Sequence, residues 1–128
     1  MLSVKHLIDT YSLTADDITQ ILDTAASFES VNNRAIKKVP ALRGRTIVNL
    51  FLEPSTRTKS SFELAEKRLS ADSLSMGGST SSVVKGESLA DTIQTISAMN
   101  VDMFVCRAKL AGTPQRITEN TDAVVINA

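Results

Sequence analysis

The residues best suited to chemistry lie in one short segment, residues 53–58, with the sequence Glu-Pro-Ser-Thr-Arg-Thr. Three of its side chains carry hydroxyl groups, those of Ser55, Thr56 and Thr58. The guanidinium of Arg57 is planar and can hold two phosphate oxygens at once. An apolar run precedes the segment and a helical pattern follows it, and the first turn of a helix offers unpaired N–H groups to an anion. The segment therefore predicts a phosphate or phosphate-ester site, with a plain helix cap beside solvated charges as the alternative.

Two further cationic side chains follow segments whose sequences predict a loop and a strand. Lys85 comes directly after a stretch rich in Ser, Thr and Gly (77–84), which also holds Ser81. Arg107 comes directly after the apolar run 101–106. Either cation alone is typical of a loop end or an exposed surface. Because the carboxyl ends of parallel strands meet at one edge of a sheet, we predict that both converge there with the Ser-Thr-Arg-Thr turn.

The segments that must position these residues alternate between strand and helix patterns. Short apolar runs predict strands over residues 47–52, 71–76, 101–106 and 123–126. Apolar residues at helical spacing predict helices over residues 14–33, 55–69, 87–99 and 114–119. The polar stretch 77–84 suits a functional loop, with a surface turn as the alternative. The alternation predicts an α/β fold, a mostly parallel sheet flanked by helices, in one domain over residues 1–128.

Two of the predicted helices begin at residues typical of an N-cap. Thr14 is followed by Asp17 in a capping-box pattern, and Ser55 precedes the second helix. In the first helix five apolar residues share one face: Ile18, Ile21, Leu22, Ala25 and Phe28. In the helix over 87–99 we expect four residues to point inward: Leu89, Ile93, Ile96 and Met99.

Composition and charge exclude several classes of function. Fourteen basic and fourteen acidic residues give a net charge of zero, which disfavours binding to nucleic acid or acidic membranes through a broad positive field. No apolar stretch is long enough to span a bilayer, and residues 1–9 lack the apolar region of a signal peptide. We therefore expect a cytoplasmic protein with no membrane or nucleic-acid partner.

The residues that most often carry metal or covalent chemistry are scarce. The single histidine, His6, is interpreted as structural, and the single cysteine, Cys106, lies in an apolar run typical of a buried core residue. The sequence has no cluster with metal-ligand spacing and no glycine-rich nucleotide loop. We expect no cofactor and no metal.

Two segments resemble the signatures of a known family. Residues 51–58, followed by Ser-Phe-Glu at 61–63, resemble the carbamoyl phosphate signature of the aspartate and ornithine carbamoyltransferases. Residues 85–92 resemble the second family segment in the form typical of the aspartate enzymes. The similarity runs over nearly the whole chain. It implies a Rossmann-like carbamoyl phosphate-binding domain, with the aspartate-binding domain absent from this chain.

The resemblance also implies roles for individual residues. The residues that would bind carbamoyl phosphate are Ser55, Thr56, Arg57, Thr58, Ser81, Lys85 and Arg107. Four of these would be catalytic: Arg57, Thr58, Lys85 and Arg107. Ser81 and Lys85 would reach into a neighbouring subunit's site, and Glu53 would pair with the aspartate domain. Lys59 and Ala108 depart from the family pattern, which usually has Arg and His at these places.

The implied reaction is transfer of a carbamoyl group from carbamoyl phosphate to the amine of L-aspartate, in pyrimidine biosynthesis. The resemblance implies a homotrimer with active sites between subunits, and we expect this chain to be inactive alone. A regulatory or dihydroorotase partner chain is not predicted by the sequence. The alternatives are a non-catalytic binding or assembly module on the same scaffold, and an ornithine carbamoyltransferase, which the Lys-Gly-Glu segment disfavours.

Overall fold

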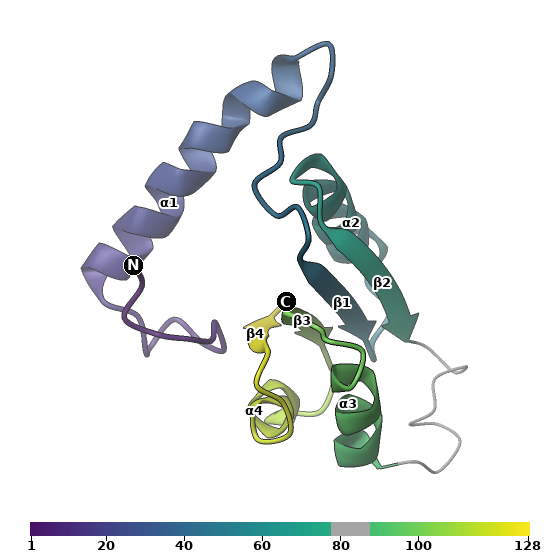
Figure 1. Ribbon diagram of the computed structural model, residues 1–128. Coiled ribbons are helices and arrows are strands. Elements are labelled where there is room, and N and C mark those ends of the chain that lie inside the picture. Colours follow the sequence, from purple (N-terminus) through teal and green to yellow (C-terminus); the bar gives the residue numbers. More distant parts are fainter. Residues whose placement is uncertain (78–87) are drawn as a thin grey trace.

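The computed structural model describes residues 1–77 and 88–128, which form a four-stranded parallel sheet with helices around it (Figure 1). The strands lie in the order β2-β1-β3-β4. Their bounds are Thr46–Phe51 for β1, Asp72–Gly77 for β2, Met103–Arg107 for β3 and Val124–Asn127 for β4. Every pairing is parallel, so all four carboxyl ends lie at one edge. The predicted α/β fold is confirmed.

The helices follow the predicted order. Their bounds are Ala15–Glu29 for α1, Thr56–Arg68 for α2, Leu89–Ser97 for α3 and Thr113–Thr118 for α4, with a 3-10 turn, η1, over Ser30–Asn33. Ser88 caps α3, since its hydroxyl accepts a hydrogen bond from the N–H of Asp91 at 3.1 Å. The predicted start of this helix at residue 87, and most of the predicted loop over 77–84, lie outside the described residues.

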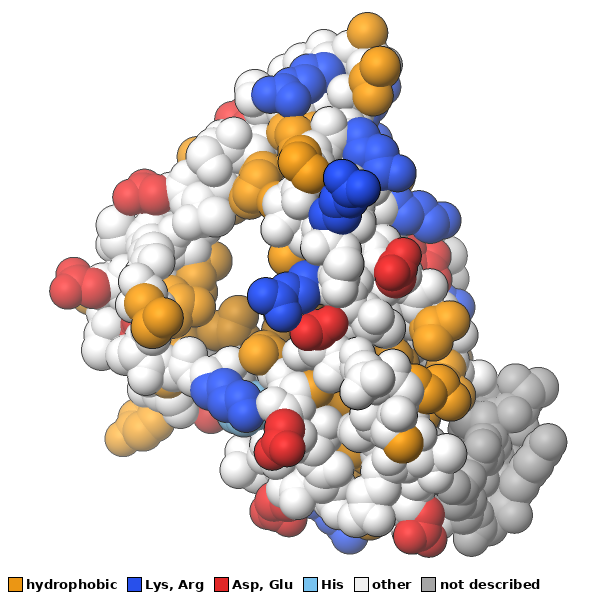
Figure 2. All heavy atoms as spheres, in the orientation of Figure 1, with side chains coloured by type: hydrophobic (Ala, Val, Ile, Leu, Met, Phe, Trp, Pro, Cys, Tyr) orange, Lys and Arg blue, Asp and Glu red, His pale blue; other side chains and the backbone are white. Residues whose placement is uncertain are grey.

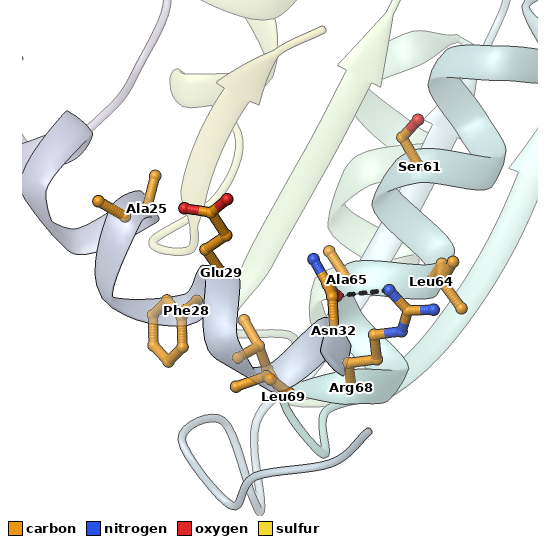
Figure 3. Close-up of a pocket in the computed structure, with 11 residues that line it drawn as sticks. Ala25, Phe28, Glu29, Asn32, Ser61, Leu64, Ala65, Arg68 and Leu69 are labelled. Carbon is orange, nitrogen blue, oxygen red and sulfur yellow. Dashed lines mark hydrogen bonds between the residues drawn. The ribbon is translucent and has the colours of Figure 1, made fainter. Parts of the chain in front are cut away.

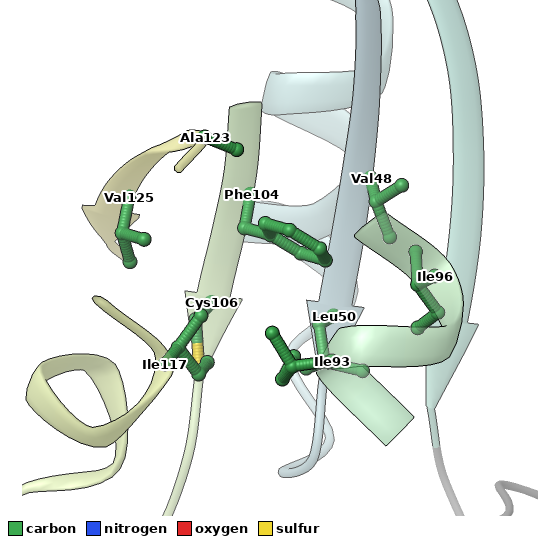
Figure 4. Packing of buried hydrophobic residues seen from close by; sticks show 9 residues of the cluster. All are labelled: Val48, Leu50, Ile93, Ile96, Phe104, Cys106, Ile117, Ala123 and Val125. Carbon is green, nitrogen blue, oxygen red and sulfur yellow. The ribbon is translucent and has the colours of Figure 1, made fainter. Parts of the chain in front are cut away.

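Alternate residues of each strand face opposite sides of the sheet, which gives two apolar clusters. The larger cluster packs β1, β3 and β4 against α3 and α4 (Figure 4); its buried residues are Val48, Leu50, Ile93, Ile96, Phe104, Cys106, Ile117, Ala123 and Val125. On the other face, Phe62 of α2 packs against a smaller cluster of Ile47, Phe51 and Val105. The two faces are thus covered by different helices, as a parallel sheet requires.

The N-terminal segment joins α1 to the far edge of the sheet. Leu7 forms a parallel bridge with Ile126 of β4, and its N–H donates to the carbonyl of Val125 at 2.9 Å. The Nδ1 atom of His6 accepts a hydrogen bond from the N–H of Val125 at 3.0 Å. Burial, and then the charge of Lys5, lowers the pKa of His6. These contacts support the structural interpretation of His6.

The capping box at the start of α1 is confirmed. The hydroxyl of Thr14 accepts from the N–H of Asp17 at 3.1 Å, and the Asp17 carboxylate accepts from the N–H of Thr14 at 2.9 Å. The same carboxylate accepts from the N–H of Ser3 at 2.7 Å. Hydrogen bonds from Ser3, and then from Thr14, hold the pKa of Asp17 well below its usual range. The box therefore also fixes the N-terminal segment.

The structure contradicts one predicted residue of a helix face, Met99, and leaves the apolar face of α1 partly exposed. Leu22 of α1 is 63% exposed and Ile18 is 41% exposed, because α1 stands apart from the sheet (Figure 1). Met99 is 60% exposed, because α3 ends at Ser97 and Met99 lies beyond its inward face. None of the helices in the described residues is long and apolar enough to cross a membrane.

Candidate functional site

The connection from β1 to α2 forms the centre of the candidate site. β1 ends at Phe51 and α2 begins at Thr56, so the chain turns at the carboxyl edge of the sheet. Ser55 occupies the N-cap position, as predicted, but its side chain makes no capping hydrogen bond. Its hydroxyl is thus not used to cap the helix, and the first-turn N–H groups remain available to an anion.

The charge at this end of α2 also favours an anion. The first turn of α2 contains no acidic residue, so nothing within it offsets the positive end of the helix dipole. Arg57 is exposed at this turn, and Thr58 is half-buried. The backbone remains a regular helix here, since the N–H of Lys59 donates to the carbonyl of Ser55 at 3.0 Å.

Arg107 lies at the same edge, one strand away. It is the last residue of β3, pairs in register with Phe51, and its carbonyl accepts from the N–H of Leu52 at 2.8 Å. Its Nη2 atom lies 3.6 Å from Oε1 of Glu53, and the two side chains are each 34% exposed. Its Nε atom is buried and has no hydrogen-bond partner among the described residues. The predicted meeting of the β1 and β3 ends is confirmed, and Arg107 retains an unused donor.

A glycine is the last residue of β2 at this edge of the sheet. Gly77, the last residue of β2, pairs in register with Phe51 and has a φ of +152°. A Cβ atom at this position would collide with the carbonyl oxygen of Phe51. Only glycine therefore lets the last residue of β2 lie so close to the end of β1. Ser81 and Lys85, which follow, lie outside the described residues, so their predicted roles remain predictions.

The two residues that depart from the family pattern, Lys59 and Ala108, make ordinary contacts within the fold. Nζ of Lys59 lies 3.9 Å from Oε1 of Glu63, one turn later in α2, so Lys59 forms an ion pair with an acidic neighbour. Ala108 is half-buried and packs against the larger apolar cluster.

Two other surface features lie away from this edge. An open, largely apolar cavity of about 710 Å³ lies between the end of α1 and α2 (Figure 3). Within it Nη1 of Arg68 donates to Oδ1 of Asn32 at 2.6 Å. Figure 2 shows several Lys and Arg side chains over the connector from α1 to β1, where residues 34–45 hold five basic and no acidic residues. Neither feature contains a predicted site residue.

The family of the chain follows from its match to a domain model. Residues 5–128 match the model described as "Aspartate/ornithine carbamoyltransferase, carbamoyl-P binding domain". The chain belongs to the aspartate/ornithine carbamoyltransferase family. The match covers all the strands and helices of the described residues.

Relatives of this carbamoyltransferase chain carry consistent names. The aspartate carbamoyltransferase catalytic subunit of Desulforapulum autotrophicum is 56% identical over 124 residues, which cover 97% of this chain and 40% of that protein. The subunit of the same name from Desulfotalea psychrophila is 53% identical over 126 residues, covering 98% and 40%. The chain thus spans about 40% of the length of these curated relatives.

Solved structures of the carbamoyltransferase family share the fold. The catalytic subunit of M. jannaschii aspartate transcarbamoylase has a TM-score of 0.87 and 39% identity, covering 98% of this chain and 40% of that one. An aspartate transcarbamoylase from Trypanosoma cruzi, in complex with carbamoyl phosphate, has a TM-score of 0.87 and 28% identity, covering 99% and 41%. An ornithine carbamoyltransferase from Pyrococcus furiosus has a TM-score of 0.84 and 30% identity, covering 95% and 38%.

The contact between Glu53 and Arg107 was not predicted from the sequence. The two residues are far apart along the chain and meet only because β1 and β3 are neighbours in the sheet. The signal that could have indicated it is the position of each charge just beyond a buried strand. This position predicts the contact only once the order of the strands in the sheet is known.

Proposed function

We propose that this chain is the carbamoyl phosphate-binding part of an aspartate carbamoyltransferase of pyrimidine biosynthesis. The observation that carries the proposal is the convergence of the β1–α2 turn, which holds Arg57, with Arg107 at one edge of the sheet. The names of the relatives, at more than 50% identity, support aspartate as the acceptor.

The phosphate group of the ligand is expected to lie against the first turn of α2. Its oxygens would accept from the backbone N–H groups and from the hydroxyls of Ser55, Thr56 and Thr58, while Arg57 provides a bidentate partner. Arg107 would contact the carbamoyl oxygen and a phosphate oxygen. Its buried Nε atom, without a partner among the described residues, supports a ligand-facing role.

The reaction proceeds by direct transfer. The amine nitrogen of aspartate forms a bond to the carbamoyl carbon, and the bond from that carbon to the phosphate oxygen breaks. The phosphate leaves with the electron pair of that bond and accepts the proton that the amine loses. Positioning of the two reactants, and neutralisation of the negative charge by Arg57 and Arg107, account for the rate acceleration without a covalent intermediate.

Several features of the whole enzyme rest on the resemblance. Ser81 and Lys85 would act in the site of a neighbouring subunit, which requires a homotrimer. The aspartate-binding residues would belong to a second domain, and the enzyme would be cytoplasmic. Glu53, which lies beside Arg107 in this structure, would pair with the second domain in the closed enzyme.

The decisive experiment is a calorimetric titration with carbamoyl phosphate of this chain and of its Arg57→Ala variant. We expect saturable binding that Arg57→Ala weakens about tenfold or more, because hydrogen bonds to a charged group contribute about 1.5–3 kcal/mol. Arg116→Ala is the matched control, because Arg116 is exposed on α4 and should leave the affinity unchanged.

An absence of binding by a chain shown to be folded would contradict this site and favour the assembly-module alternative. Equal weakening by Arg57→Ala and Arg116→Ala would point to attraction by overall charge instead of a specific site.

A further inference from the structure

A buried polar cluster lies between α2 and the sheet, on the same face as Phe62 but separate from the candidate site. Asn49 of β1 is fully buried (0% exposed), and Glu66 of α2 is 4% exposed. Nδ2 of Asn49 donates to Oε2 of Glu66 at 2.8 Å and, at 3.5 Å, to the hydroxyl of Ser75 on β2. A carboxyl group in such a place is unusual, since Glu is rarely buried without an ionic partner.

Once these hydrogen bonds are formed, the cluster has too few donors for its remaining acceptors. Both N–H bonds of the Asn49 amide are used, and the hydroxyl of Ser75 donates to Glu63 at 2.6 Å. Three buried oxygens have no partner among the described residues: Oδ1 of Asn49, Oε1 of Glu66 and Oγ of Ser73. The hydroxyl of Ser73 is the one donor left for two unpaired acceptors. Since buried polar atoms are rarely left unpaired, one further donor would complete the hydrogen bonding of the cluster.

The charges around Glu66 do not favour its ionised form. Glu63 and Lys67, on α2 itself, act in opposite senses, and Glu63 also lies 3.9 Å from Lys59. The strands packed against Glu66 present Asn49, Ser73 and Ser75, none of which titrates. No ion pair to Glu66 occurs in the part of the chain that the structure describes. An ionised carboxylate here would therefore be a buried charge without an ion-pair partner among the described residues.

We propose that Glu66 is a proton-binding site in the core, held as a neutral carboxylic acid whose O–H on Oε1 supplies the missing donor to the cluster. Burial raises the pKa of Glu66 above its ordinary value of 4.5, although the polar groups of Ser73 and Asn49 act in the opposite direction. The hydrogen-bond count and the direction of the pKa shift both favour the protonated form of Glu66.

The site links proton uptake to the packing of α2 on the sheet. The folded chain binds this proton more tightly than the unfolded chain does. The stabilisation is therefore complete below about pH 4.5 and is lost as the pH rises from there through the raised pKa. Because the first turn of α2 carries the candidate phosphate site, the helix that holds the anion is anchored by a protonated side chain.

The test compares thermal unfolding of the chain with that of Glu66→Gln at pH 5 and pH 8. Glutamine keeps the shape and supplies a donor without ionising. We expect Glu66→Gln to raise the Tm at pH 8, and this advantage to shrink by about 4 °C or more at pH 5. Glu119→Gln is the control, because Glu119 is exposed at the end of α4 and takes no part in the cluster, so its effect should change little between the two pH values.

A second measurement reports on the proton directly. The carboxyl ¹³C resonance of Glu66, assigned by its absence in Glu66→Gln, should titrate with a midpoint above the ordinary value for Glu. A midpoint at or below that value, or a Tm difference that is the same at both pH values, overturns the proposal. Neither result bears on carbamoyl phosphate binding, so failure here is distinguishable from failure of the proposed function.

Discussion

Arg107 already has an acidic neighbour in the structure, and this neighbour influences how an anion can bind. The carboxylate of Glu53 lies 3.6 Å from the guanidinium of Arg107, at a partly exposed position. A phosphate approaching Arg107 meets a group of its own sign there. The pair therefore holds the arginine side chain at the edge of the sheet and also competes with the ligand for it.

Removing this competitor should tighten phosphate binding. Glu53→Gln keeps the shape of the side chain and removes its charge. Exposed ion pairs contribute about 0.2–1 kcal/mol, so we expect the Kd for inorganic phosphate to fall by up to about fivefold in a calorimetric titration. The control is Glu119→Gln, an exposed acidic residue at the end of α4. An unchanged Kd in Glu53→Gln would show that the carboxylate does not compete with the ligand.

The candidate site could be predicted from the sequence where its residues are neighbours in the chain. The hydroxyls and the guanidinium of residues 55–58 form a single helix start, so their spacing alone places them together. The approach of Arg107 needed only the general rule that parallel strands end at one edge. The buried pairing of Asn49 with Glu66 could not be predicted, because it depends on which strand α2 covers.

At the scale of elements, the N-terminal segment depends on a histidine that must be neutral. Nδ1 of His6 can accept the N–H of Val125 only without a proton. Because the pKa of His6 is lowered, the unfolded chain binds the proton more tightly than the folded one. The stability that this bond contributes is therefore present above pH 6.5 and is lost as the pH falls below it.

We expect acidification from pH 7.5 to pH 5.5 to destabilise the N-terminal segment by about 1 kcal/mol, the contribution of one hydrogen bond. Glu66 acts in the opposite sense over part of this range, so the informative quantity is the difference between the chain and His6→Gln. Urea unfolding at both pH values measures it. The chain should lose more stability on acidification than His6→Gln, and equal losses would rule out this role for His6.

The order and type of the elements were predictable, while their contacts were less so. The capping box at Thr14 is a local signal, and it places the start of α1 correctly. The exposure of Leu22 is not a local property, since an amphipathic pattern indicates which face is apolar but not what covers it. Met99 was misplaced because the predicted helix was two residues too long.

At the scale of the whole molecule, the apolar surface is only partly covered. Leu22 and Ile18 on α1, with the cavity between α1 and α2, leave apolar side chains open to solvent. The chain spans about 40% of the length of its relatives. Such a surface suits a domain that packs against further structure.

Activity should accordingly require the longer protein. We expect the chain alone to show no carbamoyl transfer to aspartate, and a full-length protein carrying this domain to form carbamoyl aspartate in a colorimetric assay. Arg107→Ala in that protein should lower kcat/KM by about 100-fold, from the loss of a charged contact to the reacting group. Carbamoylation of ornithine in place of aspartate would favour the ornithine enzyme alternative.

The bridge between Leu7 and Ile126 has a consequence for the order of folding. It joins positions 119 residues apart (126 minus 7), and β4 pairs with β3 and with this segment. During synthesis at roughly 5–20 residues per second, β1, β2 and β3 can assemble while the N-terminal segment still lacks its partner strand, β4. Contacts between such distant positions carry a large loop-closure entropy and form late. We therefore expect the segment around Leu7 and β4 to pair after β1, β2 and β3 have assembled.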